Sequence, residues 1–563
     1  MHEIQACHLR FRAPMIRYQS QKQLSFEEFD WPLQTHMDEN NRWVQLSQCI
    51  PWDELAEAYY QDLSLKQGRP SKDARLVIGA VIIKHKLCLS DRETVAQIQE
   101  NPYLQYFVGL PGFQKEAPFN PSLFVAIRKR MGQSVFDAFQ SAIIDVIEAI
   151  SPEAQPKGLK VRAEELLQKK EEESGSTPVD ETTAEGEREA ESRLGSEPVL
   201  ETGPEPALTP ASEPTPQGKL ILDATVAPQA IRYPTDLSLL NEAREISEKI
   251  IDILYPKTDW KQKPRTYRIK ARKAYLAIAK QKRPSRKVLR QGLKQQLQYL
   301  RRNLGHIERL MDYWPEGTCI PLPRRLMYPY WVIQHLYDQQ WAMYRSNTRR
   351  CDDRIVSIHQ PYVRPIVRGK LKQPVEFGAK LSVSLTARGI ACVDRLSWDA
   401  FHEGLELQDQ VEAYRERHGH YPAVVMGDPA YGTRDNRRYL KLRGIRFAGK
   451  PLGRPKKETE ENREELKRLK AQRRKEYRQR IPIEGKFGQG KNGYRLNYIR
   501  ARRADTSVAW INSIFLVMNL LILLRIFFGR LKSAWIGTLV ALSAMIRQIY
   551  QAHGYRTVVN WSR

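Results

Sequence analysis

The sequence predicts a mixed α/β protein in which an all-α N-terminal region and an acidic linker precede a region of short strands and helices. Apolar residues make up 41% of the 563-residue chain, which is typical of a folded protein with more than one core. Apolar positions recur at helical spacing before residue 150, whereas strand-like apolar runs begin at residue 219. We expect domains at 1–150 and 219–530, followed by a helical tail at 531–563.

The N-terminal region predicts short helices, of which the last is basic. Ser90 and Glu93 have the spacing of a capping box, which opens one of these helices. The helix that follows ends in Arg128, Lys129 and Arg130. This arrangement fits a helix-turn-helix-like module that binds DNA through these three side chains. An ordinary helical bundle with a solvated basic end fits the same pattern.

Residues 151–218 differ in composition from both flanking regions. They are rich in Glu, Pro, Ser, Thr and Gly, and they include 16 acidic and 7 basic residues. Apolar residues are too sparse here to form a core. We therefore predict a disordered acidic linker between two folded units.

The charge of the whole chain indicates a polyanionic partner. It contains 91 Lys and Arg residues against 65 Asp and Glu residues, a formal net charge of +26. Nucleic acid is the usual partner of such a protein. Much of the positive charge falls in a helical insertion at 241–350, where Tyr267, Tyr275 and Tyr299 lie among the basic residues. This insertion is typical of a track for a phosphate backbone, although a solvated helical face has a similar composition.

Two further features bear on the location of the protein. None of its six cysteines lies in a C-x-x-C pair, which argues against a zinc ribbon and indicates reduced thiols.

Val508–Leu524 is nearly all apolar and approaches the length of a membrane span, but Asn512 and Asn519 lie seven residues apart on one helical face. We predict a buried core helix, with a membrane helix as the alternative. We expect a cytoplasmic, nucleoid-associated protein that does not contact a membrane.

Two aspartates stand where short apolar strands are predicted to end. The strand KLILD ends at Asp223, and the strand AVVMG is followed by Asp428. Together with two alternating runs around the turn at 386–389, the order of strands and helices is that of a domain resembling ribonuclease H. Ligands gather at such strand ends, and converging carboxylates need a cation between them. Two Mg²⁺ ions fit this chemistry, because they prefer oxygen ligands and can promote displacement at phosphorus.

A third acidic residue lies in a basic segment further along the chain. Tyr477, Arg480, Glu484 and Lys491 fall within about 60° of one another if the segment is a helix. A carboxylate flanked by Arg, Lys and Tyr would offer metal and phosphate ligation together. Pro482 and several glycines are poor helix formers, so we expect the helix to start or to kink near Pro482.

These residues carry a resemblance to a known family. The spacing Y-x2-R-x3-E-x6-K is similar to the YREK signature of DDE transposases in the IS-four/IS-five superfamily of bacterial insertion sequences. The phrases DATVAPQAIRYPTDLSLLNEAR, GDPAYGT and IEGKFGQGKNGYR are similar as well. The N-terminal unit resembles the helical domain that precedes the catalytic core of such transposases. The resemblance covers most of the chain outside the linker and the basic insertion.

The resemblance implies a role for each matching residue. Asp223, Asp428 and Glu484 would be the catalytic residues and would bind two Mg²⁺ ions, with Mn²⁺ as the alternative metal. Tyr477, Arg480 and Lys491 would contact the end of the transposon near the scissile phosphate.

Two residues near these motifs leave alternatives open. Asp236 is the alternative first aspartate, but Asp223 is preferred because it directly ends a predicted strand. Tyr431 is either a base-stacking residue or, as we expect, a packed turn tyrosine.

The resemblance also implies a reaction and its partners. The protein would hydrolyse double-stranded DNA at the terminal inverted repeats of an insertion sequence, and the freed 3′-hydroxyl would then attack target DNA. Paired ends would require a homodimer or a larger assembly. A DNA-binding protein without catalysis, including an inactive remnant of a transposase, is the alternative.

Overall fold

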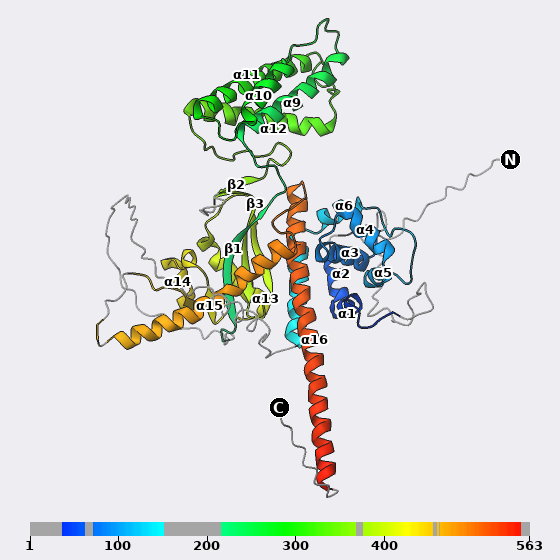
Figure 1. Cartoon of the computed structure of the whole chain (residues 1–563), viewed down its shortest axis with the longest axis vertical. Helices are drawn as coiled ribbons and strands as arrows, with labels where there is room; N and C mark the ends of the chain where they lie inside the picture. Colours follow the sequence, from blue (N-terminus) through cyan, green and yellow to red (C-terminus); the bar gives the residue numbers. More distant parts are fainter. Residues whose placement is uncertain are drawn as a thin grey trace, which may run out of the picture.

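The structure, a computed structural model, describes residues 37–61, 63, 71–150, 215–367, 375–453, 459–460 and 462–552 (Figure 1). The predicted disordered linker lies outside the described residues, except for 215–218.

The N-terminal region is helical, as the sequence predicts. Its helices are α1 (Arg42–Cys49), α2 (Trp52–Tyr60), α3 (Ala74–Lys86), α4 (Asp91–Glu100), α5 (Pro102–Phe107), α6 (Leu123–Arg130) and α7 (Gln133–Ile150). The capping box is confirmed, because the Ser90 hydroxyl accepts from the Glu93 amide and the Glu93 carboxylate accepts from the Ser90 amide. The segment DRETVAQIQENPYLQYF, which the sequence predicts to be one helix, forms two helices. Asn101 ends α4 and caps α5, because Pro102 has no N–H to continue the first helix.

The C-terminal region is built on a six-stranded mixed sheet. Its strands are β1 (Lys219–Pro228), β2 (Arg364–Val367), β3 (Val375–Thr386), β4 (Ala391–Ser397), β5 (Val424–Met426) and β6 (Arg446–Ala448). The strand order is β2-β3-β1-β5-β6, and β4 pairs with β3 on the side away from β1. β1 is antiparallel to β3 and parallel to β5, which is in turn parallel to β6. The predicted turn at 386–389 joins β3 to β4.

Helices cover both faces of the sheet. They include α13 (Leu407–His418), α14 (Arg434–Leu442) and α15 (Arg463–Gly493), with the short 3₁₀ helices η2 (Glu403–Glu406) and η3 (Pro429–Tyr431). Leu220 and Leu222 of β1 pack with α13 and α14, whereas Ile221 and Ala227 belong to the core that α15 also enters. This alternation follows from the two-residue period of a strand. Each face of β1 therefore has its own apolar layer.

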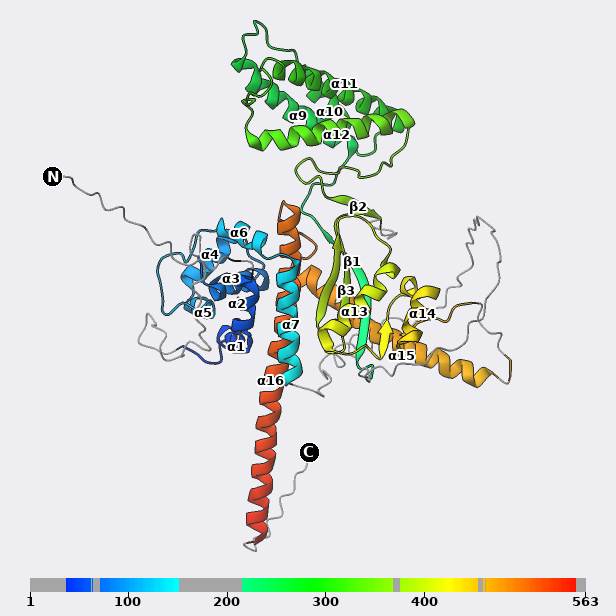
Figure 2. The ribbon, with the colours of Figure 1, turned by 180° about the vertical axis from the view of Figure 1, so that it is seen from behind.

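The basic insertion folds as a separate helical unit after β1. It contains α9 (Asp236–Leu254), η1 (Tyr255–Lys257), α10 (Arg268–Ala279), α11 (Arg286–Met311) and α12 (Arg324–Ser346). Leucines and isoleucines of α9, α11 and α12 form a core distinct from the two layers of the sheet. The unit lies beyond the β2 end of the sheet (Figures 1 and 2).

The apolar C-terminal segment is part of α16 (Ala504–Ala552), which runs between the N-terminal helices and the sheet (Figure 2). Ala504–Gly529 is long and apolar enough to cross a membrane, but most of this stretch is buried against the rest of the protein. Asn519 donates to the Ala391 carbonyl at 2.8 Å and accepts from the Ala391 amide at 3.0 Å, and Asn512 donates to the side chain of Gln133. The predicted core helix is confirmed. The expected start of a tail at 531 falls inside this single helix.

Buried charges join α16 to the N-terminal helices. Asp91 contacts Lys84 at 2.9 Å and receives two hydrogen bonds from Arg128, at 2.9 and 2.8 Å. The cations of Lys84 and Arg128 lie 4.5 and 5.4 Å from the centroid of the Trp510 ring on α16. Burial alone would raise the pKa of Asp91, but Arg128 and Lys84 lower it below its ordinary value.

We expect Asp91→Asn to destabilise the protein by about 3 kcal/mol at neutral pH, because it leaves two buried cations without a carboxylate. This value is at the lower end of the usual range, since the Asp91 side chain is 26% exposed. A carboxyl with a lowered pKa stabilises the folded state above its ordinary pKa and loses that effect as pH falls through the lowered value. The measurement is the free energy of unfolding in denaturant, at neutral and at acidic pH. The difference between the unchanged protein and Asp91→Asn should become smaller in acid. Asp145→Asn, at an exposed position, is the control. An equal loss of stability in both variants would contradict the role of Asp91 in holding the two buried cations.

We expect Asn519→Leu to lower the melting temperature, because it leaves the buried amide and carbonyl of Ala391 without the Asn519 side chain. Each such group costs about 1–3 kcal/mol. Thermal unfolding of the full chain measures the change, with the exposed Asn497→Leu as control. A membrane helix would respond in the opposite way, since leucine favours insertion into lipid. Stabilisation by Asn519→Leu would therefore argue against the core role of α16.

Candidate active site

The pairing of β1 with β5 brings the two predicted aspartates together. Leu220 pairs with Val425 and Ile221 with Met426 in parallel register. The same register, continued for two residues, sets Asp428 beside Asp223. One expectation is corrected here, because β1 does not end at Asp223. The strand continues to Pro228 through its pairing with β3, and it is the shorter β5 that stops just before Asp428.

Two short 3₁₀ helices, η2 and η3, pack against each other beside Asp428. The carboxylate of Asp428 accepts from the Ala430 amide at 2.9 Å, which begins η3. Asn436 of α14 donates to the carbonyls of both Gly404 in η2 and Tyr431 in η3, at 2.6 and 2.9 Å. A Cβ atom on Gly404 would lie 2.2 Å from the Ala430 carbonyl oxygen, so only glycine fits this close approach. The segment that carries Asp428 is therefore held rigidly.

Helix α15 carries the remaining predicted residues over the sheet. The guanidinium of Arg480 lies 3.5 Å from the Asp223 carboxylate and 2.8 Å from that of Glu484, so it bridges the two acids. The expectation that the helix starts near Pro482 is wrong, because α15 begins at Arg463 and continues through Pro482 to Gly493. Packing overrides the weak helix propensity. Ile483 and Phe487 are buried, and Gly490 lets Leu496 approach the helix closely.

Burial has the largest effect on the electrostatics of Asp223. Burial raises the pKa of Asp223 to about 6. Arg480 lowers this pKa, whereas the nearby carboxyls of Asp428 and Glu403 raise it. The Asp223 and Arg480 side chains are each 16% exposed, whereas Glu484 is 50% exposed. The site therefore has a protected part at the sheet and an open side at Glu484.

Glu403 is an acidic residue at this site that the sequence did not indicate. It lies in η2, and Lys380 of β3 contacts its carboxylate at 2.9 Å. Its charge also acts on Tyr431, whose pKa is raised first by burial and then by Glu403, Asp223 and Asp428. No motif marks Glu403 in the sequence. Only the packing of η2 on η3 places it near the two aspartates.

The chemistry of the site fits a divalent cation in part. Asp223 on β1 and Asp428 at the start of η3 offer carboxylate oxygens, which is the ligand type that Mg²⁺ prefers. Within the described residues, no three His, Cys, Asp or Glu side chains are grouped closely enough to hold an ion. Glu484 is joined to Asp223 through Arg480 instead. Cys49, Cys88, Cys319, Cys351 and Cys392 are free thiols.

The other predicted DNA contacts are spread over two elements. Tyr477 is 61% exposed on α15, with its ring 5.5 Å from the Arg480 guanidinium, and Lys491 lies near the end of the same helix. Lys129 and Arg130 are exposed at the end of α6. Arg128 is 8% exposed and bound to Asp91, so the structure gives it a structural role in place of the expected DNA contact.

Two alternatives from the sequence are also settled by packing. Asp236 starts α9, where it contacts Arg354 at 2.6 Å and accepts from Gln340 at 2.9 Å. It therefore braces the helical unit and does not join the site. Tyr431 is fully buried, which confirms it as a packed turn residue.

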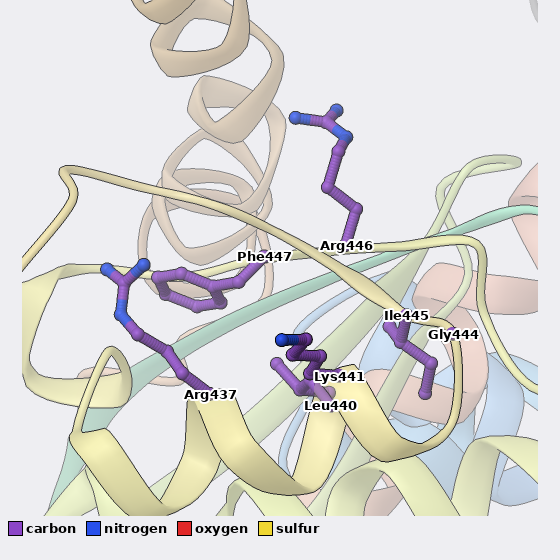
Figure 3. A pocket seen from close by; sticks show the side chains of 7 residues that line it. All are labelled: Arg437, Leu440, Lys441, Gly444, Ile445, Arg446 and Phe447. Carbon is purple, nitrogen blue, oxygen red and sulfur yellow. The ribbon is translucent and has the colours of Figure 1, made fainter.

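A shallow hollow between α14 and β6 lies apart from these carboxylates. It is lined by Arg437, Leu440, Lys441, Gly444, Ile445, Arg446 and Phe447 (Figure 3). The guanidinium of Arg437 lies 4.9 Å from the Phe447 ring and donates to the Gly432 carbonyl, so it braces this corner. No acidic side chain lines the hollow, and we do not assign it to the site.

Comparison with known proteins identifies two regions of the chain. The transposase domain DUF772 matches residues 32–130, and a transposase DDE domain matches residues 425–521. The second match includes Asp428 and Glu484, and Asp223 lies outside it. The chain is also 30% identical over 206 residues to "Uncharacterized protein ORF8 in nfe locus" of Rhizobium meliloti. That alignment covers 36% of this chain and 69% of the rhizobial protein.

No solved structure matches the chain. The two domain matches agree with the helical N-terminal region and with the part of the sheet domain that carries Asp428 and α15. The chain therefore belongs to the family of this rhizobial protein, and the two domains matched within it are those of a DDE transposase.

Proposed function

We propose that this transposase cuts double-stranded DNA at the ends of an insertion sequence and joins the freed 3′-hydroxyl to target DNA. In this proposal Asp223, Asp428 and Glu484 are the catalytic residues. The observation that carries it is the register of β1 and β5, which sets two aspartates side by side beneath α15. The strand order supports a ribonuclease H-like core, and the spacing of Tyr477, Arg480, Glu484 and Lys491 supports the YREK signature of the IS-four/IS-five superfamily.

The same three carboxylates would hold Mg²⁺, or Mn²⁺ in its place. Two bound ions would activate the attacking oxygen and stabilise the leaving oxygen of the phosphodiester. The residues of the chain fix the position of this chemistry. The Asn436 hydrogen bonds hold the loop of Asp428, and β1, which carries Asp223, pairs with β3 on one side and with β5 on the other. Glu484 is the exposed member, with its side chain 50% exposed, so it is the residue that can turn toward an arriving metal ion.

Arg480 gives the site a resident cation. In the protein alone, its guanidinium offsets the charges of Asp223 and Glu484. We propose that it turns to a DNA phosphate when metal and substrate arrive, since guanidinium groups bind carboxylate and phosphate with the same geometry. The exposed Tyr477 ring beside it, together with Lys491, would complete the contact with the transposon end.

The N-terminal helices would add a second contact with DNA. Lys129 and Arg130 are exposed at the end of α6 and can reach a phosphate backbone, whereas Arg128 cannot. We propose that the partners are the terminal inverted repeats and the target DNA. A homodimer would hold the two ends of the element together, in the cytoplasm and at the nucleoid.

We expect Asp223→Asn, Asp428→Asn and Glu484→Gln each to reduce cleavage by roughly 100-fold or more. Metal-assisted catalysis contributes several kcal/mol, and about 1.4 kcal/mol corresponds to a tenfold change in rate. The measurement is Mg²⁺-dependent nicking of a duplex that carries the ends of the element. Glu465→Gln, an exposed carboxylate near the start of α15, is the control and should cleave normally. Normal cleavage by Glu484→Gln would remove this residue from the proposed site.

We expect chelation with EDTA to stop cleavage while leaving DNA binding in place, because the basic surfaces do not depend on the ion. Added Mg²⁺ or Mn²⁺ should restore cleavage. Nicking assays and fluorescence anisotropy on the same samples separate the two effects. Cleavage that persists in EDTA would refute the metal-dependent mechanism. DNA binding without cleavage under any condition would instead favour a non-catalytic DNA-binding protein.

A further inference from the structure

The helical unit after β1 holds a dense and largely unneutralised positive charge. Between Lys261 and Arg309 the chain has 17 Lys and Arg residues and one acidic residue, Glu308. Lys263 and Arg268 both pair with Asp252. Across the described ranges, no carboxylate lies within 4.0 Å of the other 15 cations. A solvated face that served only solubility would intersperse charges of both signs, so this composition indicates a bound polyanion.

Part of this charge is arranged on one face of α11. Gln298, Arg301, Arg302, Gly305 and Arg309 are spaced three and four residues apart, and they line a shallow hollow. The three arginines are exposed. Apart from the chain neighbours of Gly305 and the backbone of α11 itself, no atom lies within 4 Å of where a Cβ atom on Gly305 would stand, so the middle of the hollow is open.

Aromatic rings hold one of these arginines in place. The Arg302 guanidinium lies 4.7 Å from the Tyr267 ring and 5.8 Å from the Tyr299 ring. Such cation–π contacts restrict a long side chain and reduce the entropy that it loses on binding. The hollow is therefore partly organised before a ligand arrives.

The dimensions and polarity of this face suit double-stranded DNA. Arg301 and Arg309 are about 12 Å apart along the helix, at about 1.5 Å per residue. A duplex carries one negative charge per about 1.7 Å of its axis, so several phosphates lie within this length. A membrane surface fits less well, because it requires an exposed apolar helix face. The apolar face of α11, which includes Leu297, Leu300 and Leu304, is buried in the core of the unit.

We propose that the face of α11 formed by Arg301, Arg302 and Arg309 binds the phosphate backbone of double-stranded DNA without reading its sequence. In both views of the molecule, α11 lies on the side of the helical unit remote from the sheet (Figures 1 and 2). This face therefore holds DNA away from the carboxylates, as a second anchoring point. The inference rests on the proposed function only in that DNA is taken as the polyanion.

The test compares the full-length protein with the triple variant Arg301→Gln, Arg302→Gln, Arg309→Gln. Binding to a duplex of arbitrary sequence is measured by fluorescence anisotropy in EDTA, over a range of salt concentrations. Each lost phosphate contact reduces the slope of log K against log salt by about 0.9, so we expect a reduction of up to about 2.7. The affinity should fall to the same extent for unrelated sequences. Circular dichroism establishes that the variant is folded.

The matched control is Arg324→Gln, Arg325→Gln, Arg345→Gln, which removes the same charge from exposed positions on α12. If the two triple variants lose the same affinity for DNA, the effect is one of net charge alone, and the proposal is overturned. A normal salt slope in the α11 variant, or tighter binding to anionic lipid vesicles than to DNA, would overturn it as well. Because binding is measured in EDTA and independently of cleavage, failure of the proposed cleavage and failure of α11 binding remain separate results.

Discussion

The arrangement of the site depends on one electrostatic constraint. Asp223 on β1 and Asp428 just after the end of β5 lie side by side, where burial and mutual repulsion disfavour two negative charges. A cation must therefore stand near them. In the protein alone that cation is Arg480, whose guanidinium also holds Glu484. The position of α15 over the sheet is thus tied to the charge of the strands beneath it.

Helix α16 supplies the mechanical support for this arrangement. It packs on the N-terminal helices and on β4, and its Asn519 side chain hydrogen-bonds the strand backbone as a further strand would. Lys84, which pairs with Asp91 of the N-terminal helices, contacts the Trp510 ring on the opposite side of α16. One apolar helix therefore serves two domains as a common core. Movement of the N-terminal helices relative to the carboxylates would require this helix to lose its packing.

Positive charge is divided among separate elements with different surroundings. Arg128 and Lys84 are buried and contribute to folding, whereas Lys129, Arg130 and the α11 arginines face solvent. Arg480 is intermediate, because it is mostly buried but faces the open side of the site. Net charge thus reports the class of partner, while burial decides which cations can reach it. A long polyanion such as DNA could contact several of these elements at once.

The sequence by itself determined the class of fold, the helical N-terminal region, the buried core helix and the two aspartates at the β1 and β5 strands. These features follow from apolar periodicity and from asparagines on one helical face, which are local properties of the chain. Tertiary structure decided the rest. Asp223 lies within a long strand because β3 extends β1 beyond β5, and α15 passes through Pro482 because α16 and the sheet pack against it. Glu403 joins the site, and Arg128 leaves the DNA surface, through contacts between residues far apart in the chain. Periodicity in a single segment carries no information about such contacts.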